Sequence, residues 1–127
     1  MRKQYFFRQS PAGLLAWDVD RLVELSREFP VREVPLDRIR ELDEPWHGDG
    51  EHQTWRELVG HVRLMDAVDL SYPIILSADG TVMDGMHRVC QALRLGRDRL
   101  EARQFETDPA PDHVGKGPED LPYDPEA

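Results

Sequence analysis

The sequence predicts a compact α+β domain, a small mixed sheet of about four strands with about three helices. Three observations support this fold class. Apolar residues recur at helical spacing in three segments, 18–29, 54–68 and 86–95, and short apolar runs of strand type lie between them. An Asp-Gly pair at 79–80 lies between two of these runs, as in tight hairpins. The chain has 127 residues, which suits one domain with one modest core.

The first predicted helix begins after an aspartate and ends at a proline. Asp18 or Asp20 can accept a hydrogen bond from an amide of the first turn. An apolar stripe of helical period then continues to Phe29. Pro30 ends the helix because proline cannot donate a backbone hydrogen bond.

A short strand, a turn and a loop are predicted between the first two helices. Residues 31–36, VREVPL, alternate imperfectly, and Pro35 favours an edge strand or a strand end. Residues 37–42 add one helical turn. Residues 43–53 contain Pro45, two glycines and no hydrophobic period, so we expect a loop of the kind that often carries function.

The second helix starts with a capping box and leads into a hairpin. Thr54 is the expected cap, and Glu57 follows three residues later. Residues 72–77, YPIILS, have the composition of a buried strand. Residues 81–83 return antiparallel to it after the turn at 79–80.

A glycine marks each end of the third predicted helix. Gly85 lets the backbone turn sharply from the strand into a helix over residues 87–95, and Gly96 caps its end. Residues 100–105 alternate and form the last predicted strand. We therefore expect residues 1–105 to be a single domain.

Residues 106–127 form an acidic, proline-rich tail. The tail holds seven acidic residues against Lys116 alone and five of the ten prolines, so we expect it to be disordered or loosely packed. Residues 1–105 carry only −3 of the net charge of −9. A near-neutral body with an acidic tail lacks the basic surface that a nucleic-acid-binding protein normally has. The acidic tail could instead contact a basic protein partner.

Cysteine usage and the N-terminus favour a cytoplasmic protein. Cys90 is the one cysteine, which excludes an intramolecular disulfide. Arg8 and Pro11 interrupt the apolar stretch near the N-terminus, so this stretch makes a poor secretory signal. No apolar run has the length of a membrane-spanning helix, and we expect no membrane partner.

The stretch DGMHR, residues 84–88, joins an acid, a glycine, an imidazole and a guanidinium where a strand meets a helix. Helical periodicity places Met86 and Cys90 on the apolar face, and His87 and Arg88 toward solvent or a cleft. The first amides of a helix are unpaired and carry a partial positive charge. This turn therefore suits an anion, and phosphate best.

The carboxylate of Asp84 would repel a phosphate bound at this turn unless a Mg²⁺ ion lies between the two groups. The same residue could instead cap the helix. A structural interpretation of the whole turn also stays open, because Asp-Gly is common turn chemistry and a first-turn His-Arg pair is often simply solvated.

The segments EVPLDRI, at 33–39, and YPIILSADGTVMDGMHRVCQALRLG, at 72–96, resemble the ParB N-terminal/sulfiredoxin superfamily. The similarity covers residues 32–105, and its most specific element is Gly85-x-His87-Arg88 at the head of a helix. The resemblance implies that this turn binds nucleotide phosphates: ATP in sulfiredoxins, ADP or ATP in free-serine kinases, and CTP in ParB proteins. By this resemblance, backbone amides near Met86 to Arg88 would hold the phosphate, and His87 and Arg88 would neutralise its charge.

The sequence departs from two branches of that superfamily. Sulfiredoxins have their catalytic cysteine where Met86 stands, and a thioether cannot form the thiolate. ParB proteins continue into a helix-turn-helix and a dimerisation domain, whereas this sequence continues into the acidic, proline-rich tail. The free-serine kinase branch shares the Asp-Gly-x-His-Arg turn and implies a Mg²⁺-dependent ATP or ADP site. Its upstream glutamate base would be Glu41 or Glu44, with Asp84 holding the Mg²⁺.

Three function classes follow. The first is a nucleotide-dependent phosphotransferase that acts on a small hydroxyl substrate. The second is a nucleotide-sensing or protein-interaction module that has the phosphate site and no base. The third is a toxin-like or nucleic-acid-acting protein, against which the net charge of −9 argues.

Overall fold

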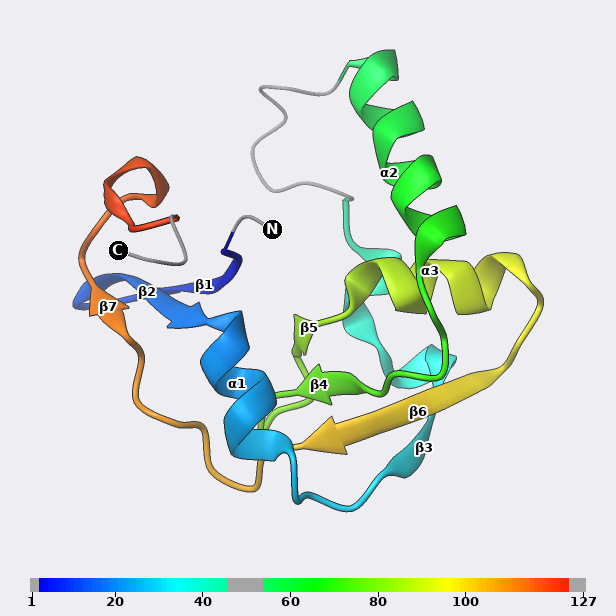
Figure 1. Cartoon of the computed structure of the whole chain (residues 1–127), viewed down its shortest axis with the longest axis horizontal. Helices are drawn as coiled ribbons and strands as arrows, with labels where there is room; N and C mark the ends of the chain where they lie inside the picture. The colour runs from blue at the N-terminus through cyan, green and yellow to red at the C-terminus, as the bar shows by residue number, and fades with distance from the viewer. Residues whose placement is uncertain (1–2, 46–53, 124–127) are drawn as a thin grey trace.

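Two sheets and three α-helices make up the part of the chain that the computed structural model describes, residues 3–45 and 54–123 (Figure 1). The larger sheet has the strand order β3-β6-β4-β5, in which β4 and β6 are parallel and the other pairs antiparallel. This sheet confirms the predicted fold class. Its strands are β3 (Arg32–Pro35), β4 (Ile74–Leu76), β5 (Val82–Asp84) and β6 (Arg99–Gln104).

The smaller sheet has three strands in the order β1-β2-β7, and the sequence analysis did not predict it. Its strands are β1 (Tyr5–Ser10), β2 (Gly13–Asp18) and β7 (His113–Val114). In the turn between β1 and β2, the Ser10 hydroxyl donates to the carbonyl of Gly13 at 2.7 Å. Across the hairpin, the rings of Phe6 and Trp17 lie opposite each other with centroids 5.5 Å apart. These cross-strand contacts stabilise the hairpin.

The described part of the acidic tail, residues 106–123, lies along this hairpin. The amides of Asp112 and Gly115 each donate to a carbonyl of β2 at 2.8 Å, and the indole of Trp17 donates to the carbonyl of Pro109 at 2.7 Å. Leu121 is buried. The sequence favoured a loosely packed tail because it lacks an apolar pattern, but backbone hydrogen bonds need no such pattern.

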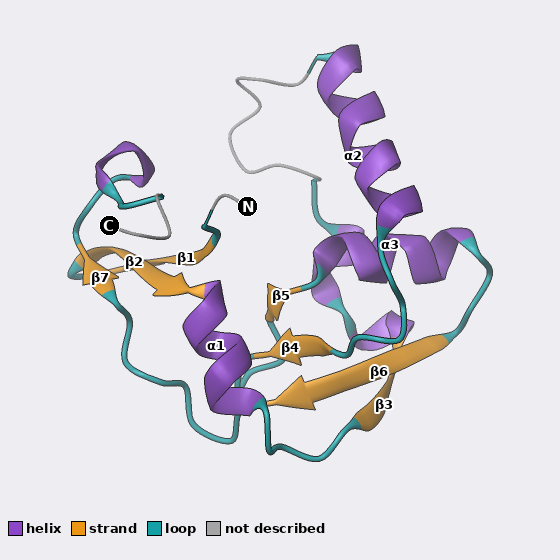
Figure 2. Ribbon diagram, in the orientation of Figure 1, coloured by secondary structure: helices purple, strands orange, loops and turns teal. Residues whose placement is uncertain are grey.

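The described residues form three α-helices (Figure 2): α1 (Val19–Ser26), α2 (Trp55–Ala67) and α3 (Met86–Arg94). The predicted caps are present, since Asp18 accepts from the amide of Asp20 and Thr54 from the amide of Glu57. The first helix ends before Phe29, the predicted end. The single turn expected over 37–42 is two 3-10 turns. Of the loop predicted over 43–53, residues 46–53 lie outside the described residues.

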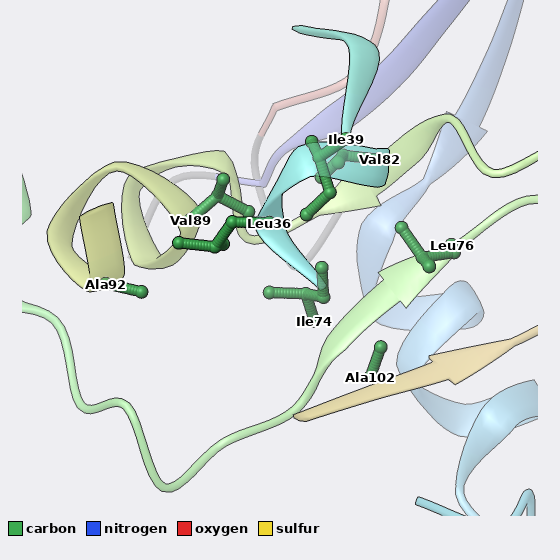
Figure 3. Packing of buried hydrophobic residues seen from close by; sticks show 8 residues of the cluster. All are labelled: Leu36, Ile39, Ile74, Leu76, Val82, Val89, Ala92 and Ala102. Atoms are coloured by element: carbon green, nitrogen blue, oxygen red, sulfur yellow. The ribbon is translucent and has the colours of Figure 1, made fainter. Parts of the chain in front are cut away.

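The core lies on both faces of the larger sheet. Ile74 and Leu76 of β4 point to one face and Ile75 to the other, as the two-residue period of a strand requires. On the first face, α3 and the 3-10 turns complete one cluster (Figure 3), made of Leu36, Ile39, Ile74, Leu76, Val82, Val89, Ala92 and Ala102. The second face carries the cluster Trp17, Leu22, Ile75, Met83 and Phe105.

α2 differs from the other two helices because none of its residues is buried. It packs mainly on α3, and in Figure 1 it extends away from the sheet. None of the helices in the described ranges is both long and apolar enough to cross a lipid bilayer.

Candidate functional site

Gly85 forms the junction between β5 and α3 that the sequence analysis singled out. Its φ of 104° and ψ of 23° lie in the left-handed region, which glycine adopts without strain. A Cβ at this position would lie 2.7 Å from both Nη2 of Arg88 and Cγ2 of Ile74. A side chain is therefore excluded by the backbone conformation and by the close approach of two neighbours.

Arg88 holds this junction together. Its Nη2 donates to Oδ2 of Asp84 at 2.9 Å, and its Nη1 donates to the carbonyl oxygens of Tyr72 and Pro73, each at 3.3 Å. The side chains of Arg88 and Asp84 are only 15% and 21% exposed. The guanidinium thus links the end of β5 to the segment before β4, and its charge is compensated by Asp84.

The first turn of α3 leaves two backbone amides available. The amides of Arg88 and Val89 donate to the carbonyl of Gly85 at 2.9 and 3.1 Å. Among the hydrogen bonds of the described residues, none comes from the amides of Met86 or His87. These two amides stand at the positive end of the helix dipole.

His87 pairs with His61 of α2, a residue that the sequence analysis did not place in the site. Nδ1 of His61 lies 2.9 Å from Nε2 of His87, and the ring centroids are 5.1 Å apart. Burial of His87, and then the nearby His61, lower the pKa of His87 below its ordinary value. The contact between His61 and His87 depends on how α2 packs on α3. The spacing of residues along the chain does not reveal this packing.

A cleft of about 820 Å³ borders the start of α3. The predicted residues Asp84, Gly85, Met86, His87 and Arg88 all line it. Lys3, Tyr5 and Tyr123, from the two ends of the chain, also line it, together with Asp69 and Tyr72 from the segment after α2. The sequence analysis did not find these five. Lys3, Tyr5 and Tyr123 escaped it because the smaller sheet, which brings the chain ends here, was not predicted.

Lys3 is a cation of the cleft that is already paired. Its Nζ lies 2.9 Å from Oδ2 of Asp18 and 3.7 Å from Oδ2 of Asp20. The hydrogen bond with Asp18 raises the pKa of Lys3, so the ammonium is charged at neutral pH.

The two candidate bases do not line the cleft. Oε2 of Glu41 accepts a hydrogen bond from the amide of Val82 at 2.6 Å, while its Oε1 is buried without a partner among the described residues. Glu44 is exposed at the end of the second 3-10 turn. The structure therefore brings Asp84, His87 and Arg88 together and leaves both glutamates outside this group.

The cleft fits a resident Mg²⁺ ion poorly. Mg²⁺ favours carboxylate oxygens that are free to coordinate it. Asp84 is already paired with Arg88, and Asp69 accepts from the amide and hydroxyl of Ser71. No group of three or more histidine, cysteine or acidic side chains within residues 3–45 and 54–123 could hold a metal ion.

Cys90 is half-buried on α3, one turn beyond His87. Burial raises the pKa of its thiol, which favours the unreactive thiol form. This environment suits the core thiol that the sequence analysis assigned to Cys90.

Comparison of the chain with protein-family models, curated proteins and solved structures finds no significant match. The resemblance to the ParB/sulfiredoxin superfamily therefore stays a prediction.

Proposed function

We propose that the chain binds the phosphate groups of a nucleotide at the start of α3, as a binding module that does not transfer the phosphoryl group. One observation carries this proposal: Met86 and His87, whose amides donate to no other described residue, line a cleft of about 820 Å³. Amides at the positive end of a helix are the usual protein ligands for phosphate.

The size and lining of the cleft support a ligand of nucleotide size. Small-molecule sites have volumes of about 300–1,000 Å³ and combine apolar walls with a few polar groups. Three tyrosines, Tyr5, Tyr72 and Tyr123, line this cleft, and Tyr72 is 64% exposed. An exposed aromatic ring offers a flat apolar surface on which a base can stack.

The charges of the cleft indicate that its affinity for an anion is modest. Two cations, Lys3 and Arg88, and two anions, Asp69 and Asp84, line it. Both cations already form ion pairs. Attraction for a phosphate therefore rests on the two amides and on the imidazole of His87.

The position of Glu41 favours binding without transfer. A general base must come within hydrogen-bond reach of the hydroxyl it deprotonates. Glu41 is held by the amide of Val82, and neither Glu41 nor Glu44 lines the cleft. The geometry thus favours the module over the phosphotransferase.

Calorimetric titration of the full chain with ATP, ADP and CTP, each with and without Mg²⁺, tests the proposal. We expect saturable binding of at least one nucleotide, with little dependence on Mg²⁺ and no product from hydroxylated amino acids. Absence of heat with all three nucleotides, for a chain shown to be folded by circular dichroism, would refute it.

A further inference from the structure

We propose that the N-terminal half of α2 is a docking surface for an acidic amphipathic helix of another protein. The docking surface consists of three exposed apolar residues, Trp55, Leu58 and Val59, with Arg56 and Arg63 along one side of them. Of the described residues that line the cleft, none belongs to α2, so this inference is independent of the phosphate site.

The apolar stripe of α2 is longer than the part of it that packs on α3. Residues at helical spacing form the stripe: Trp55, Leu58, Val59, Val62 and Met65. In the C-terminal half of the helix, Val62 and Met65 are half-buried, and residues 61 and 66 contact α3 through their side chains. In the N-terminal half, Trp55 is 85% exposed, Val59 51% and Leu58 37%.

The exposed half of the stripe has the composition of a binding surface. Short helices gain most of their stability by packing an apolar face against other elements, and here half of that face is not packed. Figure 1 shows α2 extending away from the sheet, which leaves this half accessible. Tryptophan is among the residues that contribute most to the affinity of protein interfaces, and Trp55 is the most exposed large apolar residue of the described chain.

The charges beside the exposed stripe are positive. Arg56 and Arg63 are seven residues apart, two helical turns, so both lie on the same side of α2. Both are exposed, and neither forms an ion pair or a hydrogen bond with any described residue. Of the two acids of α2, Asp66 is paired with Arg94, and Glu57 lies on the side opposite the stripe. Charge complementarity therefore favours an acidic partner, although the whole chain carries −9.

The form of the surface favours a helix as the partner. α2 offers side-chain ridges and no free strand edge, so an extended segment could not add main-chain hydrogen bonds to it. A helix packed along α2 needs apolar residues three and four positions apart to meet the stripe. Two acidic residues seven positions apart, on one flank of that helix, would then face Arg56 and Arg63.

A second copy of the chain fits this surface less well. Two antiparallel α2 helices related by a two-fold axis bring the same flank of each helix together, so arginines would face arginines. A parallel pair would set the arginines against the flank that packs on α3. An anionic membrane is disfavoured by the net charge of −9.

Two designed peptides of about 20 residues, long enough to form a helix, probe the surface. Both have leucines at the spacing of the stripe. One carries glutamates on its flanks at positions seven residues apart, and the other carries lysines at the same positions. Fluorescence anisotropy of the labelled peptides, at concentrations at which each peptide alone is monomeric, measures their affinity for the full chain.

The charge-reversed variant is Arg56→Glu/Arg63→Glu. Its matched control is Arg32→Glu/Arg38→Glu, which reverses two exposed arginines of β3 and of the first 3-10 turn and changes the net charge equally. We expect the wild type and the control to bind the glutamate peptide about tenfold more tightly than the lysine peptide. The Arg56→Glu/Arg63→Glu variant should prefer the lysine peptide.

Trp55→Ala tests the apolar part of the surface. It should weaken binding of the glutamate peptide by about tenfold or more at an unchanged melting temperature, because the side chain is exposed. Absence of saturable binding of the glutamate peptide to the folded wild type, or equal loss of affinity in both charge-reversed variants, would overturn the inference. A dimer in sedimentation equilibrium, or binding to phosphatidylserine vesicles, would also overturn it if Trp55→Ala abolished that association.

Discussion

The guanidinium of Arg88 donates to the carboxylate of Asp84 at 2.9 Å, across the turn at which β5 becomes α3. The sequence suggested that both side chains contact a ligand, the arginine through phosphate and the aspartate through Mg²⁺. In the structure they neutralise each other beside the cleft. The proposed anion site is therefore made of backbone amides and His87, and the ion pair shapes the turn that presents them.

Removal of this ion pair is expected to destabilise the fold. Arg88→Ala leaves Asp84 without its cation and two carbonyl groups without their donor, which should lower the free energy of unfolding by about 2–3 kcal/mol. Arg94→Ala is the matched control, because its pair with Asp66 is 42% and 59% exposed and should contribute less than about 1 kcal/mol. Urea denaturation measures both, and equal losses would contradict the role given to Arg88.

Substitution of Gly85 by alanine should lower the free energy of unfolding more than the same substitution at another glycine with a positive φ. Gly80 also has a positive φ, 90°, but a Cβ there meets no atom within 4 Å. Gly80→Ala should cost about 1 kcal/mol from strain alone. Gly85→Ala should cost about 2 kcal/mol more, because Arg88 and Ile74 must move. Thermal or urea unfolding measures the stability of both variants. Equal losses of stability would exclude this crowding at Gly85.

Glu41 is expected to act in stability and not in ligand binding. Glu41→Ala leaves the amide of Val82 unpaired, which should cost about 1–3 kcal/mol. The exposed Glu44→Ala should change the free energy of unfolding by less than about 0.5 kcal/mol. Neither variant should change the dissociation constant for ATP. A weaker ATP complex in Glu41→Ala at unchanged stability would return Glu41 to the site.

Cys90 should react slowly while the chain is folded. Burial raises the pKa of the thiol, so the thiolate fraction at pH 7 is smaller than in a free cysteine. Alkylation by iodoacetamide, followed by mass spectrometry, should be slower in buffer than in denaturant by at least about tenfold. Equal rates under the two conditions would show that the thiol is exposed.

Sequence reasoning predicted those elements whose signals are local. The Thr54 cap, the turn at 79–80 and the glycine before α3 each act within a few residues, and the four-stranded sheet follows from the apolar runs between them. The smaller sheet escaped prediction because three consecutive aromatic residues, at 5–7, hide the alternation of β1. Its third strand, β7, comes from nearly a hundred residues further along the chain.

The sequence indicated where a cleft lies, but not how the side chains that line it are paired. The residues 84–88 do line a cleft at the start of a helix, as the pattern of glycine and first-turn amides indicated. The partners of His87 and Arg88 could not be predicted, since the His61 contact depends on the packing of α2 and the two carbonyl contacts on the path of the chain before β4.

The most direct test of the phosphate site follows the backbone amides of Met86 and His87 by ¹⁵N NMR while ATP is added. A phosphate accepted by these amides should shift both resonances in a saturable manner, with a dissociation constant that agrees with calorimetry. Saturable shifts confined to other residues, or amides at the start of α3 that stay unchanged at full occupancy, would contradict the account.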